Sequence, residues 1–474
     1  MGRVLAAAVF VAYAALTLWV TLHHEPWRDE ADTWLIARDA TSGELLRIPG
    51  HRGVPLLWDA MLRPFAQAGA PYLAQQLLNL ACIWGAVLLL MRSHAFPWPV
   101  KVVFPFSFYA SYEYAALARP YALLALLLFA MAECWRTREE RPVRLAIAIA
   151  LLANATVHGL FAAAVAGGLL LVSWGPSVFS RENAGLRARR SRGDGDGDGR
   201  RRLAAIAIML FGGLVSVAQL WPREGGQKVY QLISIDTLWY TLAAAFFPGF
   251  RTETGAVLGL FVLGVITVAI SRRMVPPVWL WTTLIAVLAV FVFIWMGGYR
   301  HAGIVLMLAI TAIWMAEAYG PLRQERLAMA ALFVALALSI VPAWRAWRDE
   351  TRFLYGGGRL MAQYIRANGL TEASFAGGAL MWNSWMLDLP PVRVWLARGE
   401  YGSFSKWERR DQAASAEEAI RAAQAHYRGQ KWFLMLSRTL PPELASQFRL
   451  RYATPPLEWG QRDERYYLYE AVTP

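Results

Sequence analysis

Two adjacent carboxylates, Asp29 and Glu30, come shortly after the first apolar run of the chain, residues 4–22. They belong to the polar stretch 23–34, which also contains two histidines and Arg28. Charge at the mouth of a membrane-spanning helix is costly, and carboxylates there can accept a proton or interact strongly with a charged substrate. The same residues also fit a solvated loop at the polar end of a helix. The rest of the sequence decides between the two interpretations.

The composition is that of a polytopic membrane protein. Hydrophobic residues make up 57% of the 474 residues and charged residues only 17%. Apolar runs close to 20 residues long recur along the chain, which is typical of membrane-spanning helices. The net charge of +13 predicts no nucleic-acid partner, because the arginines concentrate in short loops where they set orientation in the bilayer.

The membrane part is predicted to be all-α, with about eleven helices. The first run is longer than the apolar core of a usual signal peptide and lacks a clear cleavage site, so we expect an uncleaved first helix. Both cysteines, Cys82 and Cys134, fall in apolar runs, so no disulfide framework is predicted. The apolar runs cover residues 4–22, 72–91, 102–118, 120–135, 144–158, 159–175, 203–221, 254–271, 278–296, 302–318 and 327–343.

Arginine-rich loops give a predicted orientation in a bacterial-type inner membrane. The positive-inside rule assigns these loops to the cytoplasm without conflict, and the N-terminus with them: 92–101, 136–144, 181–202, 272–273 and 323–326. The complementary segments then face the periplasm or the cell exterior: 23–70, 112–120, 158–159, 221–250, 297–301 and 344–474.

Charged residues that orientation does not explain share this outward side. They are Asp29, Glu30, Glu113, Arg119, Arg300 and His301. Ionisable groups within or at the edge of a membrane mark functional sites. Their convergence on one side favours a site over a solvated loop.

The chain divides into a membrane domain, 1–343, and a soluble domain, 344–474. The external loop 23–70 is expected to carry one or two interfacial helices anchored by Trp34 and Trp58. The segment 181–202 is interpreted as a basic cytoplasmic linker, because its Gly-Asp repeat lacks the closing glutamate of a calcium loop.

The soluble domain is predicted to be a small α/β layer. Its pattern indicates helices over 358–368 and 416–426 and strands over 431–436 and 465–472. Four tryptophans of this domain either line a carbohydrate platform or pack the domain against the membrane: Trp382, Trp385, Trp395 and Trp407.

Four motifs of the membrane domain resemble the GT-C class of integral-membrane glycosyltransferases. The likeness is to the protein O-mannosyltransferase and aminoarabinose-transferase-like family. Trp27-Arg28-Asp29-Glu30-Ala31 looks like the acidic motif of the family's first external loop, and His51-Arg52-Gly53-Val54-Pro55-Leu56 is similar to its histidine and Pro-Leu segment. Ala118-Arg119-Pro120-Tyr121, with Glu113 upstream, looks like its Arg-x-Tyr segment, and Tyr299-Arg300-His301 resembles a later external arginine motif.

The likeness covers residues 1–343 and departs from better-known members in two respects. Glu113 lies farther upstream of Arg119 than expected, and the tail is short. These departures leave the second acidic residue and the acceptor open.

The resemblance implies transfer of a sugar, with inversion, from a polyprenyl-phosphate donor in the bilayer to an unidentified acceptor. This reaction needs a carboxylate to accept a proton from the acceptor and fixed cations to stabilise the departing lipid phosphate. Asp29 is the predicted base, and Glu30 is the competing choice. Arg119, Arg300 and His301 are predicted to hold the phosphate, because a guanidinium fork pairs bidentately with it.

Three further residues are predicted to bind substrate: His51, Glu113 and Tyr121. His51 orients the donor or stabilises its loop, and Tyr121 packs beside Arg119, bonds the sugar or belongs to an aromatic belt. Arg28 and Arg52 are weaker phosphate candidates that fit lipid headgroups equally well.

No cofactor is predicted, because His, Cys and carboxylates do not cluster at a recognisable metal-ligand spacing. A metal bridged by Asp29 and Glu30 stays open. The alternative function is a transporter or lipid flippase, against which the absence of an inverted repeat counts. A catalytically dead scaffold is a third possibility, which would tolerate the loss of Asp29.

Overall fold

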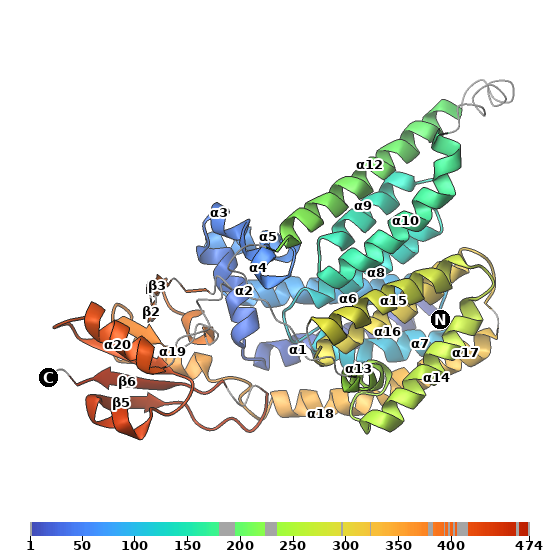
Figure 1. Ribbon diagram of the computed structural model, residues 1–474. Helices are drawn as coiled ribbons and strands as arrows, with labels where there is room; N and C mark the ends of the chain where they lie inside the picture. The colour runs from blue at the N-terminus through green and yellow to red at the C-terminus, as the bar shows by residue number, and fades with distance from the viewer. Residues whose placement is uncertain are drawn as a thin grey trace.

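The computed structural model describes residues 2–179, 195–222, 235–294, 297–322, 324–377, 383–392, 394–396, 399–401, 403–404, 416–460 and 464–472. The helices of the membrane domain are α1 (Gly2–His23), α2 (Arg28–Asp39), α3 (Ser42–Leu45), α4 (Ile48–Arg52), α5 (Leu57–Gln67), α6 (Leu73–Arg92), α7 (Trp98–Val103), η1 (Phe104–Phe106), η2 (Tyr109–Glu113), α8 (Tyr121–Trp135), α9 (Pro142–Ala153), α10 (Val157–Phe179), α12 (Gly195–Leu220), α13 (Asp236–Phe246), α14 (Thr252–Ile270), α15 (Val275–Phe293), α16 (Tyr299–Glu317), α17 (Glu325–Leu338) and α18 (Ile340–Glu350) (Figure 1).

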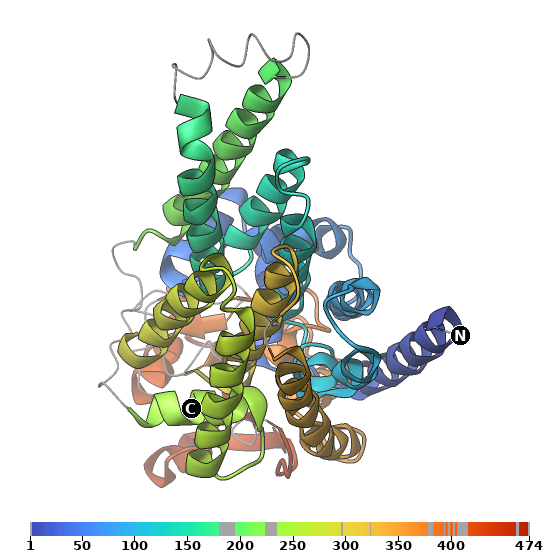
Figure 2. The ribbon, with the colours of Figure 1, turned by 90° about the vertical axis from the view of Figure 1, so that its right-hand side faces the viewer.

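Long apolar helices confirm the predicted polytopic architecture. Within the described residues, eight stretches are long and apolar enough to cross a membrane, and α8 and α9 are shorter apolar helices. The central one is α16, whose apolar window is 83% buried against neighbours that include α8, α13 and α15. By contrast, α1 stands at the edge of the bundle (Figure 2) and its window is only 28% buried. Helices with apolar residues all round suit a lipid surrounding.

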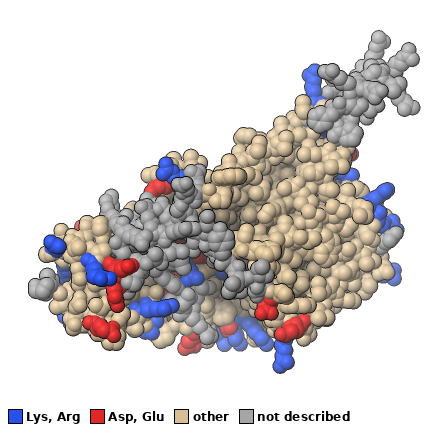
Figure 3. Space-filling view, in the orientation of Figure 1, with Lys and Arg blue, Asp and Glu red and all other residues tan. Residues whose placement is uncertain are grey.

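Charge is distributed as a membrane protein requires. On the face in Figure 3, Lys, Arg, Asp and Glu gather on the C-terminal domain and at the opposite edge, while the surface over α10, α12 and α15 carries almost none. Large apolar side chains such as Val172, Phe211 and Ile285 are exposed on these helices. The protein is therefore an integral membrane protein.

The predicted helix over 102–118 is wrong. The chain there forms α7, then the short helical turns η1 and η2, with Pro105 at the first break. Proline removes a backbone N–H and its ring clashes with the preceding turn. The carbonyls of Tyr114 and Ala115 accept hydrogen bonds of 2.9 Å from Asn79 Nδ2 of α6, which satisfies backbone groups that the break leaves without a helical partner.

Two other boundaries differ from the prediction. The break expected at 158–159 lies at 154–156, where Asn154 Nδ2 donates to the carbonyls of Ala150 and Gly212 at 2.9 Å. Of the predicted linker 181–202, residues 181–194 lie outside the described residues, and 195–202 already belong to α12.

The segment 23–70 is more helical and more buried than predicted. It contains α2, α3, α4 and α5, and α2 begins at Arg28, inside the polar stretch itself. Trp34 and Trp58 are only 1% exposed, so the prediction that they anchor the loop at the interface is wrong. Both pack in the core, because α2 packs on α5 beneath the C-terminal domain.

The C-terminal domain is the predicted small α/β layer. Its elements are α19 (Gly358–Ala367), β1 (Ser374–Gly377), η3 (Ser384–Met386), β2 (Val394–Leu396), β3 (Gly399–Tyr401), α20 (Ala416–His426), β4 (Trp432–Leu436), η5 (Pro442–Gln447), β5 (Phe448–Ala453) and β6 (Tyr467–Ala471). The sheet order is β3-β2-β1-β4-β6-β5, with β1 parallel to β2 and β4 and the other pairs antiparallel. The predicted helices and strands are all present, with ends shifted by at most two residues.

The tryptophans of this domain do not gather into a described sugar platform. Trp385 is 1% exposed and packs against Phe375, with ring centroids 5.3 Å apart. Trp395 stacks on His426 at 3.5 Å. Trp382 and Trp407 lie outside the described residues. The two described rings therefore serve packing within the domain.

Candidate active site

Asp29 is surrounded by three arginines. Its Oδ2 lies 3.6 Å from Arg119 Nη1 and 3.9 Å from Arg300 Nη1, and its Oδ1 lies 3.8 Å from Arg28 Nε. The Asp29 side chain is 28% exposed. A carboxylate that is reachable from outside thus lies within a cationic cluster, which suits the binding of an anionic group next to a proton acceptor.

The arginines come from three segments far apart in the sequence. Arg28 and Asp29 occupy the first turn of α2, Arg119 lies two residues before α8, and Arg300 lies in the first turn of α16. Arg119 Nη1 donates to the Asp29 carbonyl at 2.8 Å, which holds the loop before α8 on α2. The Arg300 guanidinium lies 4.3 Å from the centroid of the Trp27 ring, a cation–π distance. The start of α2, the segment before α8 and the start of α16 thus hold the three arginines around Asp29.

The structure separates the two adjacent carboxylates. Glu30 is fully buried, and its Oε2 accepts from His24 Nε2 at 2.8 Å and from the Trp27 backbone N–H at 3.3 Å. Its Oε1 accepts from Tyr72 Oη at 3.2 Å and from the Ala118 backbone N–H at 2.5 Å. With both oxygens taken inside the protein, Glu30 ties α2 to the segment that carries Arg119. Only Asp29 faces outward.

His24 is the centre of this buried network. Its Nε2 donates to Glu30, and its Nδ1 donates to Glu350 Oε1 of α18 at 2.9 Å. Burial lowers the pKa of His24, but the two carboxylates outweigh it and raise the pKa to about 10. His24 is therefore an imidazolium with both N–H groups engaged. It links the end of α1 to α2 and α18.

Tyr121 and His301 form a second polar pair beside the arginines. His301 Nδ1 accepts from the Gly298 backbone N–H at 3.0 Å, so in a neutral ring Nε2 carries the proton. Nε2 then donates to Tyr121 Oη at 2.8 Å, which leaves the tyrosine hydrogen available to another acceptor. Tyr121 also stacks on Tyr114, with ring centroids 5.9 Å apart. His301 is therefore placed to orient Tyr121.

The remaining predicted residues occupy different surroundings. Glu113 is buried at the end of η2 and interacts electrostatically with Arg300. Among the described residues, its Oε2 has no hydrogen-bond partner. His51 is the last residue but one of α4, which packs mainly on α12 and α3. Arg52 beside it pairs with the buried Asp59 at 2.5 Å, a structural ion pair.

Sequence reasoning missed three contributors to the site. His24 lay in the polar stretch but was given no role, and Glu350 has no sequence signal because its partner is 326 residues away. His158 is buried in the first turn of α10, and its ring centroid lies 5.9 Å from that of His301. Within the described part of the chain, neither ring nitrogen of His158 has a partner. A histidine in a predicted outward segment was the available signal.

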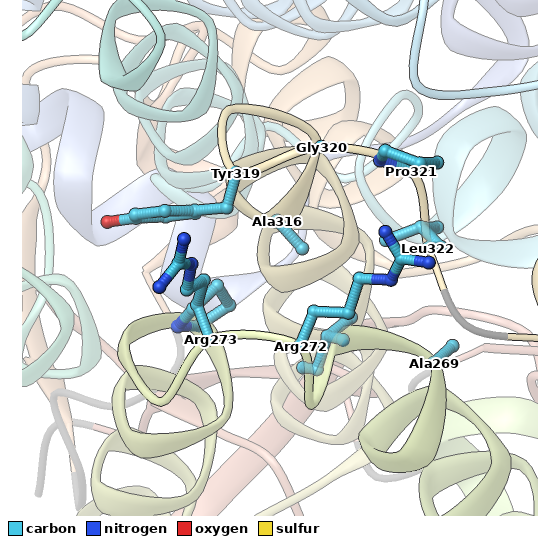
Figure 4. A pocket seen from close by; sticks show the side chains of 10 residues that line it. Ala269, Arg272, Arg273, Ala316, Tyr319, Gly320, Pro321 and Leu322 are labelled. Carbon is cyan, nitrogen blue, oxygen red and sulfur yellow. The ribbon is translucent and has the colours of Figure 1, made fainter.

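A small hollow lies at the other end of α16. Figure 4 shows its lining: Ala269, Ile270, Arg272, Arg273, Pro276, Ala316, Tyr319, Gly320, Pro321 and Leu322. The 19 residues of α16 span about 28 Å, so the hollow is far from Arg300. Its lining contains no carboxylate or histidine that could accept a proton. The hollow is therefore not part of the site around Asp29.

Comparison with known proteins identifies the architecture. Neither protein-family models nor curated proteins match this sequence. The crystal structure of ArnT from Cupriavidus metallidurans in the apo state matches with a TM-score of 0.57 and 13% identity, over 100% of this chain and 99% of that one. The chain is similar in fold to ArnT. The structure of the same ArnT bound to undecaprenyl phosphate matches with a TM-score of 0.54 and 14% identity, over 98% of both chains.

The likeness to ArnT includes the C-terminal domain, since both alignments extend over nearly the whole of each chain. At this identity it shows a common fold. The predicted resemblance to the GT-C architecture is therefore confirmed at the level of the fold.

Proposed function

We propose that this protein transfers a sugar from a polyprenyl-phosphate donor to an acceptor at the external face of the membrane, with Asp29 as general base. The observation that carries the proposal is the partly exposed Asp29 carboxylate within 4 Å of three arginines, which come from α2, the segment before α8 and the start of α16. The shared fold with ArnT, one structure of which is bound to undecaprenyl phosphate, supports a lipid-linked donor.

The arrangement suits an inverting displacement. Asp29 takes the proton from the acceptor hydroxyl or amine, whose lone pair forms the new bond to the anomeric carbon. The bond from that carbon to the phosphate oxygen breaks, and the lipid phosphate leaves with the electron pair. Arg28, Arg119 and Arg300 stabilise its charge, and the Tyr121 hydroxyl donates to the sugar or the phosphate. Glu30 and His24 hold α2 and the segment that carries Arg119 in place.

We further propose that the reaction needs no metal ion. In the described part of the chain, no three His, Cys, Asp or Glu side chains lie together as metal ligands do. A cation bridged by Asp29 and Glu30 conflicts with the surroundings of both, because three arginines face Asp29 and hydrogen bonds occupy both oxygens of Glu30. The arginines supply the positive charge that a metal would otherwise provide.

A transport assay separates this proposal from a flippase. Membranes with or without the protein are incubated with polyprenyl phosphates that carry a radiolabelled hexose, pentose or aminopentose. A transferase moves label out of the lipid fraction, whereas a flippase leaves it there and changes only its accessibility across the bilayer. Movement of intact labelled lipid without loss of label would replace the proposal by the transport function.

Arg300→Ala is expected to raise the KM for the lipid donor by roughly 10- to 100-fold, the worth of a hydrogen bond to a charged group. Arg300→Lys keeps the charge but loses the planar fork, so its KM should fall between those of the wild type and the alanine variant. Donor titrations in detergent or nanodiscs measure both. Arg326→Ala in α17, where no role in the site is assigned, is the matched control. An unchanged KM in Arg300→Ala would remove Arg300 from the phosphate site.

A further inference from the structure

The C-terminal domain makes hydrogen bonds to α2 along the length of this helix. Asn383 Nδ2 donates to Asp32 Oδ1 at 3.1 Å, and both residues are buried. One helical turn and a half farther on, Arg38 Nη1 donates to the carbonyls of Leu387 and Leu389 at 3.3 and 3.2 Å. Ser403 also donates to Asp39. The helix that carries Asp29 in its first turn thus packs on both α5 and the C-terminal domain.

Glu464, which lies just before β6, extends the contact between the C-terminal domain and α2 to the start of this helix. Glu464 is fully buried, and its Oε1 accepts from Ser384 Oγ at 2.6 Å and from Tyr466 Oη at 3.0 Å. Its Oε2 has no hydrogen bond of ordinary geometry among the described residues. The backbone N–H and the guanidinium of Arg28 interact with this carboxyl group. Glu464 therefore lies on the side of the C-terminal domain that faces the start of α2, where η3, which carries Ser384, packs on α2.

Glycines allow this close approach. A Cβ atom at Gly358 would come within 2.3 Å of Ser384 Oγ, and one at Gly357 would lie 3.0 Å from the Glu464 carbonyl. The Gly357 backbone N–H donates to that carbonyl at 3.1 Å. A Cβ at Gly356 would lie 3.7 Å from Glu464 Oε2 and 3.8 Å from the Pro26 carbonyl. The glycine run 356–358 thus lets the segment between α18 and α19 lie close to Ser384, to Glu464 and to the Pro26 carbonyl just before α2.

Burial raises the pKa of Glu464 to about 8, against hydrogen bonds from Ser384 and Tyr466 and the nearby Arg28. At neutral pH the group is therefore largely a carboxylic acid. Glutamine has the same shape and the same capacity to accept and donate, so it is the conservative replacement. Alanine removes the contact altogether.

We propose that Glu464 is a positioning residue for the reaction: it holds the first turn of α2, and with it Asp29, from the side of the C-terminal domain. This rests on the proposed function only for the role of Asp29. The C-terminal domain then contributes to turnover without touching the substrate. Arg119 and Arg300 are carried by other segments, so the donor site keeps two of its three cations when this contact is lost.

The test compares Glu464→Ala and Glu464→Gln with the wild type in the full-length protein. Active protein is counted by titrating its binding sites with undecaprenyl phosphate, and turnover is expressed per site. We expect Glu464→Ala to lower kcat at least roughly tenfold with little change in donor KM, since small misplacements of a reacting group are costly. Glu464→Gln should restore most of the turnover. Glu470→Ala, which removes a surface carboxylate of β6 paired with Lys431, is the matched control.

Hydrogen exchange of residues 28–39 gives a readout that does not depend on activity. Faster exchange in Glu464→Ala than in Glu464→Gln or Glu470→Ala supports the positioning role even if no donor is turned over, in which case only the proposed function fails. The positioning role would be overturned if Glu464→Ala kept the wild-type exchange rate and kcat. It would also be overturned if the alanine and glutamine variants lost kcat to the same extent. If Glu464→Ala does not fold, Asn383→Ala loosens the same helix at Asp32 and is measured in the same way.

Discussion

Asp29→Asn is expected to lower kcat for sugar transfer by roughly 10²- to 10⁴-fold, the usual contribution of a positioned general base. The amide has the same shape but accepts no proton at neutral pH. Label transfer from a radiolabelled polyprenyl-phosphate donor measures the loss in membranes that contain equal amounts of wild type and variant.

Binding should change in the opposite direction. Asp29 is the acidic group among Arg28, Arg119 and Arg300, so its neutralisation removes a charge that repels the donor phosphate. We expect undecaprenyl phosphate to bind Asp29→Asn at least as tightly as it binds the wild type. Weaker binding together with weaker turnover would show instead that Asp29 is needed to organise the arginines.

Two control variants show whether the loss of kcat is specific to Asp29. Asp236→Asn makes the same chemical change on the exposed first turn of α13 and should leave kcat unchanged. Glu30→Gln changes the neighbouring carboxylate, whose oxygens are both held inside the protein. It is expected to lower thermal stability and the yield of folded protein. A fully active Asp29→Asn would show that Asp29 is not the general base, whereas no label transfer by either protein would favour the scaffold or transport function.

The sequence predicted the members of the cationic cluster because topology alone brings them together. The positive-inside rule places Asp29, Arg119 and Arg300 on one side of the bilayer, at the ends of three helices, and helix ends on one side of a bundle can meet. The same reasoning could not separate Asp29 from Glu30. Neighbours on a helix point in directions about 100° apart, and only the packing of α2 on its partners decides which one is buried.

The predictions that were wrong concern features that depend on contacts between distant segments of the chain. Hydropathy predicted one helix over 102–118, because an average over 17 residues does not register Pro105 or the side chain of Asn79 that satisfies the broken backbone. Trp34 and Trp58 matched an interfacial composition, but the packing of α2 on α5 places both in the core. The link from Tyr121 to His301 joins residues 180 positions apart, and no local pattern encodes it.

His24→Gln is expected to destabilise the protein by about 3–5 kcal/mol, the cost of removing one partner from a buried ionic network. His24, Glu30 and Glu350 have no exposed side-chain surface, so water cannot compensate for the lost charge. The two carboxylates and one imidazolium carry a net charge of −1, and the variant leaves −2 in the same volume. Thermal unfolding in detergent, followed by intrinsic tryptophan fluorescence, measures the change.

A second substitution tests whether charge is the cause. His24→Gln with Glu350→Gln returns the net charge to −1, so the double variant should be more stable than His24→Gln alone.

The pH dependence of stability gives an independent test of the charge on His24. The pKa of His24 is raised from 6.5 to about 10, so its stabilising contribution is complete below about pH 6.5 and is lost as the pH rises towards 10. The wild type should lose stability across this range more steeply than His24→Gln. Parallel curves, or a double variant less stable than the single one, would mean that His24 acts through packing and not as the cation that holds α1, α2 and α18 together.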